Sequence, residues 1–207
     1  MKRPLSAPSA QRNRGPILDV LRASLPERGS VLEIASGTGE HVVWFAAALP
    51  GLVFQPSDPD AAARASIEAR IAQTRLPNVR APLALDASAA HWSLPSEVAE
   101  SLVAILCINM IHIAPWPATL GLMRGAGRLL RAGGVLYLYG AYKRSGRHTA
   151  PSNEAFDRSL RAQDPLWGVR NLEDVVAEAA AQELDLAEVV EMPANNLSVL
   201  LRRRENE

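Results

Sequence analysis

The sequence predicts an α/β domain built on a mostly parallel sheet with helices on both faces. Short aliphatic runs alternate along the chain with longer segments of helical periodicity, which is the pattern of β-α-β units. One run, Leu102 to Ile108, is continuously apolar, as expected for a parallel strand that is covered on both faces. With 207 residues, 48% of them hydrophobic, the chain is long enough to bury the core of one such domain.

The first part of the chain is expected to hold a tail followed by helices and strands in alternation. Residues 1–11 are rich in Pro, Ser and Ala and predict a flexible N-terminal tail, so we expect one domain over residues 12–207. A helix is expected from Gly15-Pro16, with Pro26 beyond its end. The next elements are expected to be a strand that ends at Ile34, a helix over 40–49, a strand over 52–55 and a helix over 61–75.

The second part of the chain predicts the rest of the sheet. The last two strands are close in sequence and predict an antiparallel C-terminal hairpin, and the total is a seven-stranded sheet. A long basic loop over 140–148 is expected to act as a lid or to contact substrate. The elements expected here are strands at 82–87, 102–108, 135–139, 184–190 and 197–202, and helices at 119–130, from 152 and at 172–182 with Asn171 as cap.

Composition excludes several classes of function. Lysine plus arginine and aspartate plus glutamate are equal at 22 each, so no global field favours nucleic acid or a membrane surface. The longest apolar run, residues 102–111, is too short to span a bilayer. A single cysteine excludes an internal disulfide and a multi-cysteine zinc site, which favours a reducing, cytoplasmic location, and we expect no metal. The basic tail gives a weak alternative, a transit peptide, but it lacks a clear amphipathic face.

A glycine turn after the first strand is the strongest functional signal. Gly37 and Gly39 stand between that strand and the helix that follows. Glycine takes positive φ at low cost, and a helix N-terminus carries partial positive charge, so the turn can bring backbone N–H groups close to a nucleotide. A dinucleotide fingerprint has a third glycine at the position of Val42, so a pyrophosphate site is disfavoured.

Three acidic residues lie at or near the ends of the first three expected strands, at similar spacing in the sequence. Glu33 lies on the first strand, Asp58 follows the second and Asp86 ends the third. In a parallel nucleotide-binding fold, an acid at the end of the second strand binds the ribose hydroxyls. Asp86 fits an acid that accepts from the adenine amine, although it can equally be a helix N-cap, and Asp60 is better explained as a cap. Together the three acids indicate a nucleoside cofactor.

These motifs resemble those of a known family. The turn is similar to the first motif of class I S-adenosylmethionine (SAM) methyltransferases, E/D-x-G-x-G-x-G, with Ala35 in place of the first glycine. More widely, the chain looks like the methyltransferase-like family that is described only as a domain of unknown function, with Ala141 where we expect proline. The segments that carry this resemblance are Arg12-Asn13, Leu32 to Gly39, Gln55 to Asp58, Ile108 to Ile113, Pro115-Trp116, Tyr139-Gly140, Ser152-Asn153, Trp167 to Arg170 and Met192 to Leu197.

The resemblance implies a Rossmann-like class I methyltransferase fold and SAM as cofactor. In that family the strand acid helps to hold the amino end of the cofactor and the glycines leave room for its tail. Arg12 and Asn13 are expected to close over the cofactor from the N-terminal side. The residues that we assign to the cofactor are Arg12, Asn13, Glu33, Ala35, Gly37, Thr38, Gly39, Asp58, Asp86, Ala87 and Asn109.

The substrate side is expected to involve His112, Tyr142 and Asn153. The end of the fourth strand is where a ligand of an open α/β sheet binds. His112 follows that strand and has the residue type of a general base, although it can equally orient a loop. Methyl transfer needs a base only when the acceptor must lose a proton, because positioning supplies much of the rate. The acceptor is expected to be a small molecule.

Two alternatives stay open at this point. The chain could be a SAM-fold binding or regulatory protein without turnover. It could also be a nicotinamide-dependent oxidoreductase, which Val42 and the Ala-Ser-Gly-Thr-Gly turn disfavour. A nucleic-acid methyltransferase is disfavoured by the zero net charge.

Overall fold

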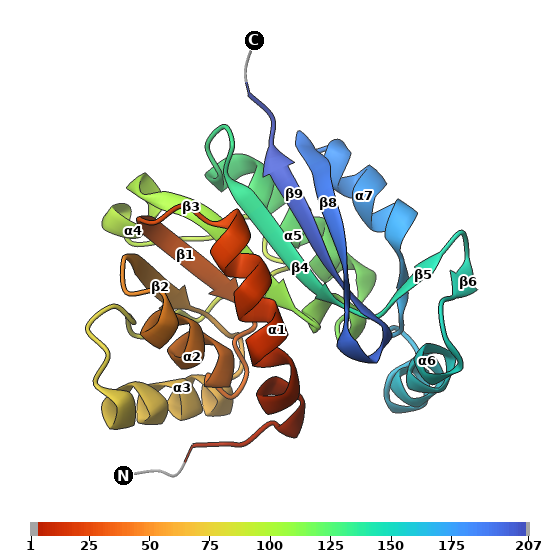
Figure 1. The fold of residues 1–207 in the computed structure, drawn as a ribbon, viewed down its shortest axis with the longest axis horizontal. Helices are drawn as coiled ribbons and strands as arrows, with labels where there is room; N and C mark the ends of the chain where they lie inside the picture. Colours follow the sequence, from red (N-terminus) through yellow and green to blue (C-terminus); the bar gives the residue numbers. More distant parts are fainter. Residues whose placement is uncertain (1–3, 206–207) are drawn as a thin grey trace. The chain divides into compact units, whose positions relative to one another are not determined.

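A computed structural model describes residues 4–205 (Figure 1), and the chain divides into two compact units. Unit 1 comprises Met1–Asp86 and Trp92–Leu106, and unit 2 comprises Ala87–His91 and Cys107–Glu207. Among the described residues, six strands form one sheet in the order β2-β1-β3-β4-β9-β8, and three short strands form a second sheet in the order β6-β5-β7. The larger sheet corrects the expected count of seven strands.

Unit 1 contains the N-terminal strands and helices. Strands β1 and β2 are parallel, with Gly29 opposite Leu52 and Glu33 opposite Pro56. The apolar residues of β1 are buried, as a strand covered on both faces requires. The elements of unit 1 are α1 (Pro8–Ser24), β1 (Gly29–Ile34), α2 (Glu40–Ala48), β2 (Leu52–Pro56), α3 (Ala61–Thr74), α4 (Ser96–Glu100) and most of β3 (Leu102–Ile108).

Helix α1 begins earlier than the sequence predicts. It starts at Pro8, inside the segment expected to be a flexible tail, and Ala10 is buried. Proline at the first helical position loses no hydrogen bond, so Pro8 is a suitable start. The helix then continues through Pro16, which lies inside it. Its expected apolar face is buried at Ile17, Leu18 and Leu21, and α1 packs against α2.

The expected strand at residues 82–87 does not form. This part of the chain runs beside β2 but makes only isolated bridges, between Phe54 and Val79 and between Ser57 and Leu83. Neither Pro82 nor Pro56 on β2 has an N–H to donate, and the two bridges differ in register by one residue, so no continuous ladder forms. The missing seventh strand of the larger sheet is this segment.

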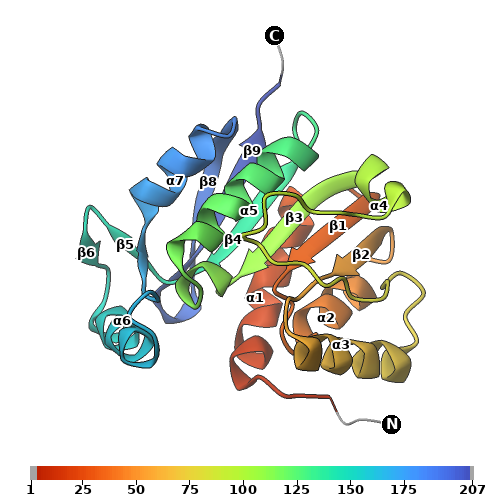
Figure 2. The ribbon, with the colours of Figure 1, turned by 180° about the vertical axis from the view of Figure 1, so that it is seen from behind.

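Unit 2 ends in the expected antiparallel hairpin. Strand β4 pairs with β9, and β9 pairs with β8. Helices α5 and α7 cover the same face of these three strands (Figures 1 and 2). The elements of unit 2 are the 3-10 turn η1 (Met110–His112), α5 (Trp116–Leu129), β4 (Val135–Gly140), β5 (Tyr142–Arg144), β6 (Arg147–His148), α6 (Pro151–Gln163), β7 (Arg170–Asn171), α7 (Leu172–Ala180), β8 (Leu184–Met192), the turn η2 (Pro193–Asn195) and β9 (Asn196–Arg203).

The segment expected to be a basic lid loop is largely the second sheet. Residues 142–144 form β5 and residues 147–148 form β6, with β7 on the other side of β5. Tyr142 is fully buried, and Lys143 forms an ion pair with Asp157 at 3.2 Å. The aromatic ring and the paired lysine anchor this segment to the body of unit 2, which explains why it is ordered into strands.

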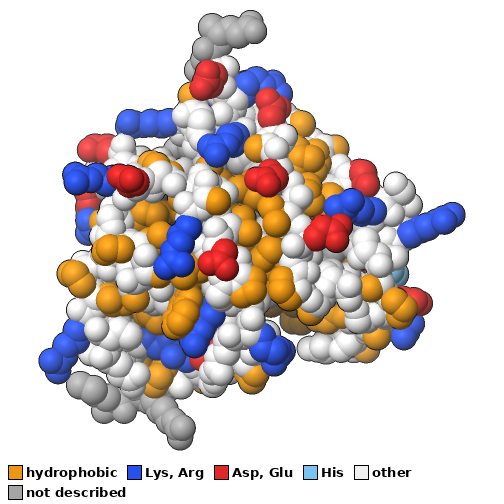
Figure 3. All heavy atoms as spheres, viewed as in Figure 1, with side chains coloured by type: hydrophobic (Ala, Val, Ile, Leu, Met, Phe, Trp, Pro, Cys, Tyr) orange, Lys and Arg blue, Asp and Glu red, His pale blue; other side chains and the backbone are white. Residues whose placement is uncertain are grey.

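Charged side chains of both signs are interspersed on the face shown in Figure 3. This distribution agrees with the equal numbers of acidic and basic residues in the sequence. Within residues 4–205, none of the helices combines the length and the apolar composition that a membrane span requires.

Two helical glycines provide a test of the packing. A Cβ added to Gly121 of α5 would lie 2.0 Å from the carbonyl oxygen of Ala87, whereas a Cβ on Gly15 of α1 would meet nothing within 4 Å. We expect Gly121→Ala to lower the free energy of unfolding by more than about 1 kcal/mol through overpacking. The matched variant Gly15→Ala should change it by less than about 0.5 kcal/mol, because the gain in helix propensity is opposed by crowding of the new Cβ against the ring of Pro16. Urea denaturation measures both, and a Gly121→Ala protein as stable as wild type would contradict the packing described.

Candidate functional site

The turn between β1 and α2 combines three residues with left-handed backbone. Gly37 has φ 55° and Gly39, the N-cap of α2, has φ 79°. Ala35 has φ 54°, so the residue that replaces the first glycine of the motif takes the conformation for which glycine is favoured. A Cβ on Gly37 would meet nothing within 4 Å, so the turn leaves open space at this residue. This is the geometry expected of a backbone cradle.

Hydrogen bonds tie this turn to the end of β2. The amide of Gly37 donates to Oδ2 of Asp58 at 2.9 Å, and the amide of Asp60 donates to Oδ1 of the same carboxylate at 2.9 Å. The hydroxyl of Ser57 donates to the carbonyl of Glu33 at 2.7 Å. Each oxygen of a carboxylate can accept more than one hydrogen bond, so Asp58 retains acceptor capacity. Asp60 also accepts from the amide of Ala63, which confirms it as the cap of α3.

Glu33 is a buried acid without a full set of partners. Its side chain is 2% exposed, and Oε2 has no hydrogen-bond partner among the described residues. Burial raises the pKa of Glu33 from 4.5 to about 7. An unsatisfied carboxylate oxygen inside a protein is costly, and a cationic ligand group beside it would relieve that cost. The residues present here therefore fit a cofactor that carries an amino group.

The remaining cofactor candidates are divided between the two units. In unit 1, Asp86 is exposed, and the carbonyl of Thr38 accepts from Ser66 Oγ and from Arg70 Nε at 2.9 and 2.8 Å. In unit 2, Ala87 is buried, and Asn109 follows β3 with φ 63°. Hydrogen bonds thus bring together the first motif and Asp58, and the amide of Asn109 donates to the carbonyl of Tyr139 within unit 2 at 2.8 Å.

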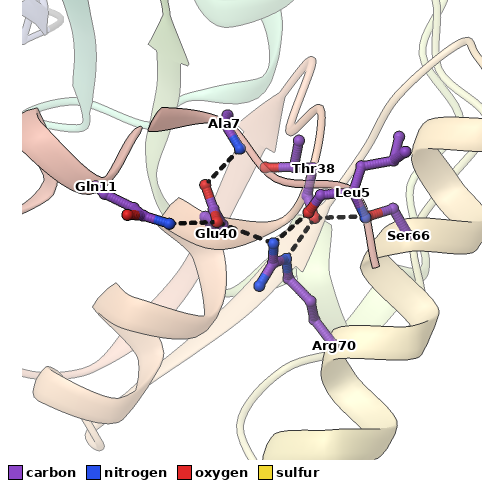
Figure 4. A network of polar contacts seen from close by, with 7 residues as sticks. All are labelled: Leu5, Ala7, Gln11, Thr38, Glu40, Ser66 and Arg70. Carbon is purple, nitrogen blue, oxygen red and sulfur yellow. Dashed lines mark hydrogen bonds and ion pairs between the residues drawn. The ribbon is translucent and has the colours of Figure 1, made fainter. Parts of the chain in front are cut away.

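A polar network fastens the N-terminal segment beside the glycine turn (Figure 4). Glu40, the first residue of α2, accepts from the amide of Ala7 at 3.1 Å and forms an ion pair with Arg70 at 3.0 Å. Arg70 also donates to the carbonyl oxygens of Thr38 and Leu5. Sequence reasoning missed Glu40 and Arg70, although an acid in the first turn of a helix that follows a glycine turn is a usable signal.

Asn13 and His41 form a second link between α1 and α2. Asn13 Oδ1 lies 2.8 Å from His41 Nε2, and the His41 ring stacks on Phe45 with 5.5 Å between ring centroids. Burial lowers the pKa of His41 to about 4, so this imidazole is neutral at physiological pH. Asn13 and Phe45 cover this ring, although a histidine near the start of a helix gives no sign of such burial in the sequence. Arg12, the other N-terminal candidate, is exposed.

The three substrate-side candidates lie in the interior of unit 2. His112 is 0% exposed, and in the described part of the chain neither ring nitrogen has a hydrogen-bond partner. Burial, reinforced by the charge of Arg170, lowers the pKa of His112 to about 3. The ring meets the edge of Tyr142, with 5.1 Å between centroids, and burial raises the pKa of that phenol well above 10. These groups are neutral at physiological pH.

The structure does not gather all three candidates. His112 and Tyr142 are in contact, whereas the Asn153 amide donates to Thr149 Oγ1 at 3.0 Å and to the carbonyl of Asn195 at 2.8 Å. A Cβ on Gly140 would lie 2.2 Å from His112 Nε2, so glycine is required where the ring packs against β4. Over residues 4–205, no group of three or more His, Cys, Asp or Glu side chains is arranged to hold a metal ion.

Comparison with solved structures defines the class of fold. The chain aligns with human N-acetylserotonin methyltransferase in complex with SAM (TM-score 0.78, 11% identity, 95% of this chain and 53% of that one). It also aligns with the mitomycin 7-O-methyltransferase MmcR (TM-score 0.76, 13% identity, 94% and 54%) and with the SAM-dependent methyltransferase SibL (TM-score 0.75, 20% identity, 95% and 56%). The chain therefore has the α/β fold of class I SAM-dependent methyltransferases, and it spans little more than half the length of these proteins.

The family is narrower than the fold class. Residues 4–203 match the family described as "Protein of unknown function (DUF938)". Because this match covers nearly the whole sequence, the chain belongs to that family. The resemblance inferred from the glycine turn and the scattered motifs is thereby confirmed.

The buried acid Glu33 predicts a specific dependence of stability on pH. Below pH 4.5 the carboxyl is protonated in both states, and between pH 4.5 and 7 only the unfolded state loses its proton, so stability falls as pH rises. The variant Glu33→Gln should lack the part of this loss of stability that ionisation of Glu33 causes. We expect its advantage in free energy of unfolding over wild type to grow by roughly 3 kcal/mol from pH 4.5 to 8, at about 1.36 kcal/mol per pKa unit.

Urea denaturation across that pH range checks this expectation. Glu97→Gln, at an exposed ion pair with Arg80, is the matched control and should show no such trend. An energy difference between Glu33→Gln and wild type that does not vary with pH would contradict the assigned protonation of Glu33.

The network around Glu40 predicts how tightly the N-terminal segment is held. Arg70→Met removes the donors to Leu5, Thr38 and Glu40, so the backbone amides of residues 5–11 should exchange with solvent at least about tenfold faster. Hydrogen exchange followed by mass spectrometry measures this. Arg80→Met, at an exposed pair, should leave the exchange unchanged. Equal protection in the Arg70→Met and wild-type proteins would show that the network does not hold the segment.

Proposed function

We propose that this protein is a SAM-dependent methyltransferase that acts on a small-molecule acceptor. The observation that carries the proposal is the buried, incompletely satisfied carboxylate of Glu33 beside the open glycine turn. The fold supports it, since the similar proteins include one solved with SAM and others named for small molecules, mitomycin and N-acetylserotonin.

Residues of unit 1 would hold most of the cofactor. Glu33 would accept from its amino group, and the turn at Gly37 and Gly39 would leave room for its tail. Asp58, already fixed by two backbone amides, would bind the ribose hydroxyls, because a carboxylate held at both oxygens cannot rotate away. Asp86 is proposed to accept from the adenine amine. Further contacts are proposed for Arg12, Asn13, Ala35, Thr38, Ala87 and Asn109.

Methyl transfer from SAM depends more on how the acceptor is positioned than on transfer of a proton. SAM supplies an activated methyl group when bound. The protein must then orient the acceptor and exclude water, which supplies much of the rate. His112 is a weak base when its pKa is lowered to about 3. We therefore propose that His112, Tyr142 and Asn153 shape the acceptor side of the protein rather than transfer protons.

Calorimetric titration with SAM and S-adenosylhomocysteine tests the cofactor site. We expect micromolar binding by wild type and at least a tenfold loss for Glu33→Gln, equivalent to about 1.4 kcal/mol. Glu97→Gln has the same change of charge at an exposed site of unit 1 and should bind as wild type does. Below pH 7, binding should release a proton from Glu33, which titration in buffers of different ionisation enthalpy detects.

The outcomes separate this proposal from its alternatives. Folded wild-type protein that binds neither ligand would refute the methyltransferase function. Stronger retention of NAD than of SAM would indicate an oxidoreductase. SAM binding without transfer of a labelled methyl group to any compound of a metabolite extract would indicate a binding or regulatory protein.

A further inference from the structure

A cavity of about 280 Å³ in unit 2 gathers positive charge that the proposed function does not use. Trp116, the first residue of α5, forms one wall. Lys143 of β5, Arg161 of α6 and Arg170 of β7 contribute the basic side chains, and Asp174 of α7 is the acidic one. All of these residues belong to unit 2, so the cavity is complete within that unit.

Arg170 brings a positive charge without an ion-pair partner into this cavity. Its guanidinium donates to the carbonyl oxygens of Ile111, Ala114 and Leu166 at 2.7 to 2.9 Å, and all three acceptors are neutral. Among residues 4–205, no carboxylate lies within ion-pair distance of it. Burial and the nearby charge of Arg161 lower its pKa, and Asp157 offsets only part of this effect. An anion in the cavity would stabilise both guanidinium groups.

The acid nearest to these cations is already shared. Asp157 pairs with Lys143 and with Arg161, each at 3.2 Å, and lies 3.4 Å from His148. It also accepts from the amide of Val169 at 2.8 Å. A Cβ on Gly168 would lie 2.7 Å from Asp157 Oδ1, so glycine at this position allows the chain to pass close to the carboxylate. Asp157 thus fixes the basic side chains and leaves positive charge in excess.

Two helices begin at the same cavity. The N-caps of α5 and α7 are Pro115 and Asn171, and in the described structure neither side chain caps its helix. Asn171 Oδ1 instead accepts from the amide of Gly146 at 3.0 Å. Helix α7 carries Glu173 and Asp174 in its first turn, and in α5 the amide of Ala118 already donates to the carbonyl of Pro115. The positive potential of the cavity therefore comes from the basic side chains rather than from the helix ends.

We propose that this cavity binds the oxyanion, a carboxylate or a phosphate, of a small molecule with an aromatic body. The oxyanion would lie against Arg170 and Lys143. The indole of Trp116, whose ring centroid is 5.6 Å from the Arg170 guanidinium carbon, would pack on the ring of the ligand. This proposal concerns unit 2 alone, so it does not depend on whether the protein binds SAM.

Titration of the full chain with four small probes tests the site. Benzoate and phenyl phosphate carry both the oxyanion and the ring, benzamide carries the ring alone and inorganic phosphate carries the oxyanion alone. Two-dimensional NMR of the amides of Val169 and Asn171 reports binding at the cavity itself. We expect saturable shifts with benzoate or phenyl phosphate, and affinities at least tenfold lower for benzamide and inorganic phosphate.

Variants with opposite expected effects keep the test independent of folding defects. Arg170→Gln should weaken binding of the preferred probe at least tenfold. Asp174→Asn removes the one acid that lines the cavity and should tighten binding severalfold. Arg158→Gln, which loses a charge on the exposed face of α6 where Arg158 pairs with Glu154, is the matched control and should bind as wild type does.

Comparison of the two anionic probes shows which oxyanion the cavity prefers. A preference for benzoate assigns a carboxylate ligand, and a preference for phenyl phosphate assigns a phosphate ester, and either supports the proposal. Equal binding of benzamide, absence of shifts with both anionic probes, or equal weakening by Arg158→Gln and Arg170→Gln would overturn it.

Discussion

The hydrogen bonds between the end of β1 and the end of β2 are the constraint on which the candidate cofactor site depends. The amide of Ser36 donates to the carbonyl of Ser57, and the hydroxyl of Ser57 returns to the carbonyl of Glu33. These bonds fix the main chain on both sides of Ala35 and before Gly37, the two residues of the turn that take left-handed conformations. A backbone at positive φ persists only where its surroundings determine it, and here two adjacent strand ends provide that restraint.

Local patterns predicted the parts of the structure that local chemistry decides. The glycine turn, the cap at Asp60 and the C-terminal hairpin all follow from residues close in sequence. The contacts that set burial come from distant residues, which local patterns do not show. His41 is covered by Asn13, which lies 28 positions away. The strand expected at 82–87 does not form because pairing depends on N–H groups and on a constant register. The apolar pattern took account neither of Pro56 and Pro82 nor of the shift in register between the two bridges.

The candidate site itself was only partly predictable. Glu33 and Asp58 were predicted as cofactor residues because acids at strand ends follow a simple topological rule. The structure joins Asp58 to the glycine turn and the carbonyl of Glu33 to the end of β2. The importance of Arg70 could not be found in that way, because an arginine in the middle of an exposed-looking helix has many possible partners. Likewise, Tyr142 in a basic segment resembles a surface residue until the second sheet is known, and only then is its burial explained.

The proline inside α1 has a consequence for how this helix unfolds. Pro16 cannot donate to the carbonyl of Arg12, so the hydrogen-bond ladder of α1 is interrupted near its middle. Three of the four buried residues of the helix, Ile17, Leu18 and Leu21, lie after this break, and only the small Ala10 lies before it. Opening of the first turns therefore does not propagate into the anchored half, and α1 behaves as two cooperative units of unequal stability. The contacts of Ala7, Gln11 and Asn13 with α2 therefore have to hold the N-terminal half largely without an apolar anchor.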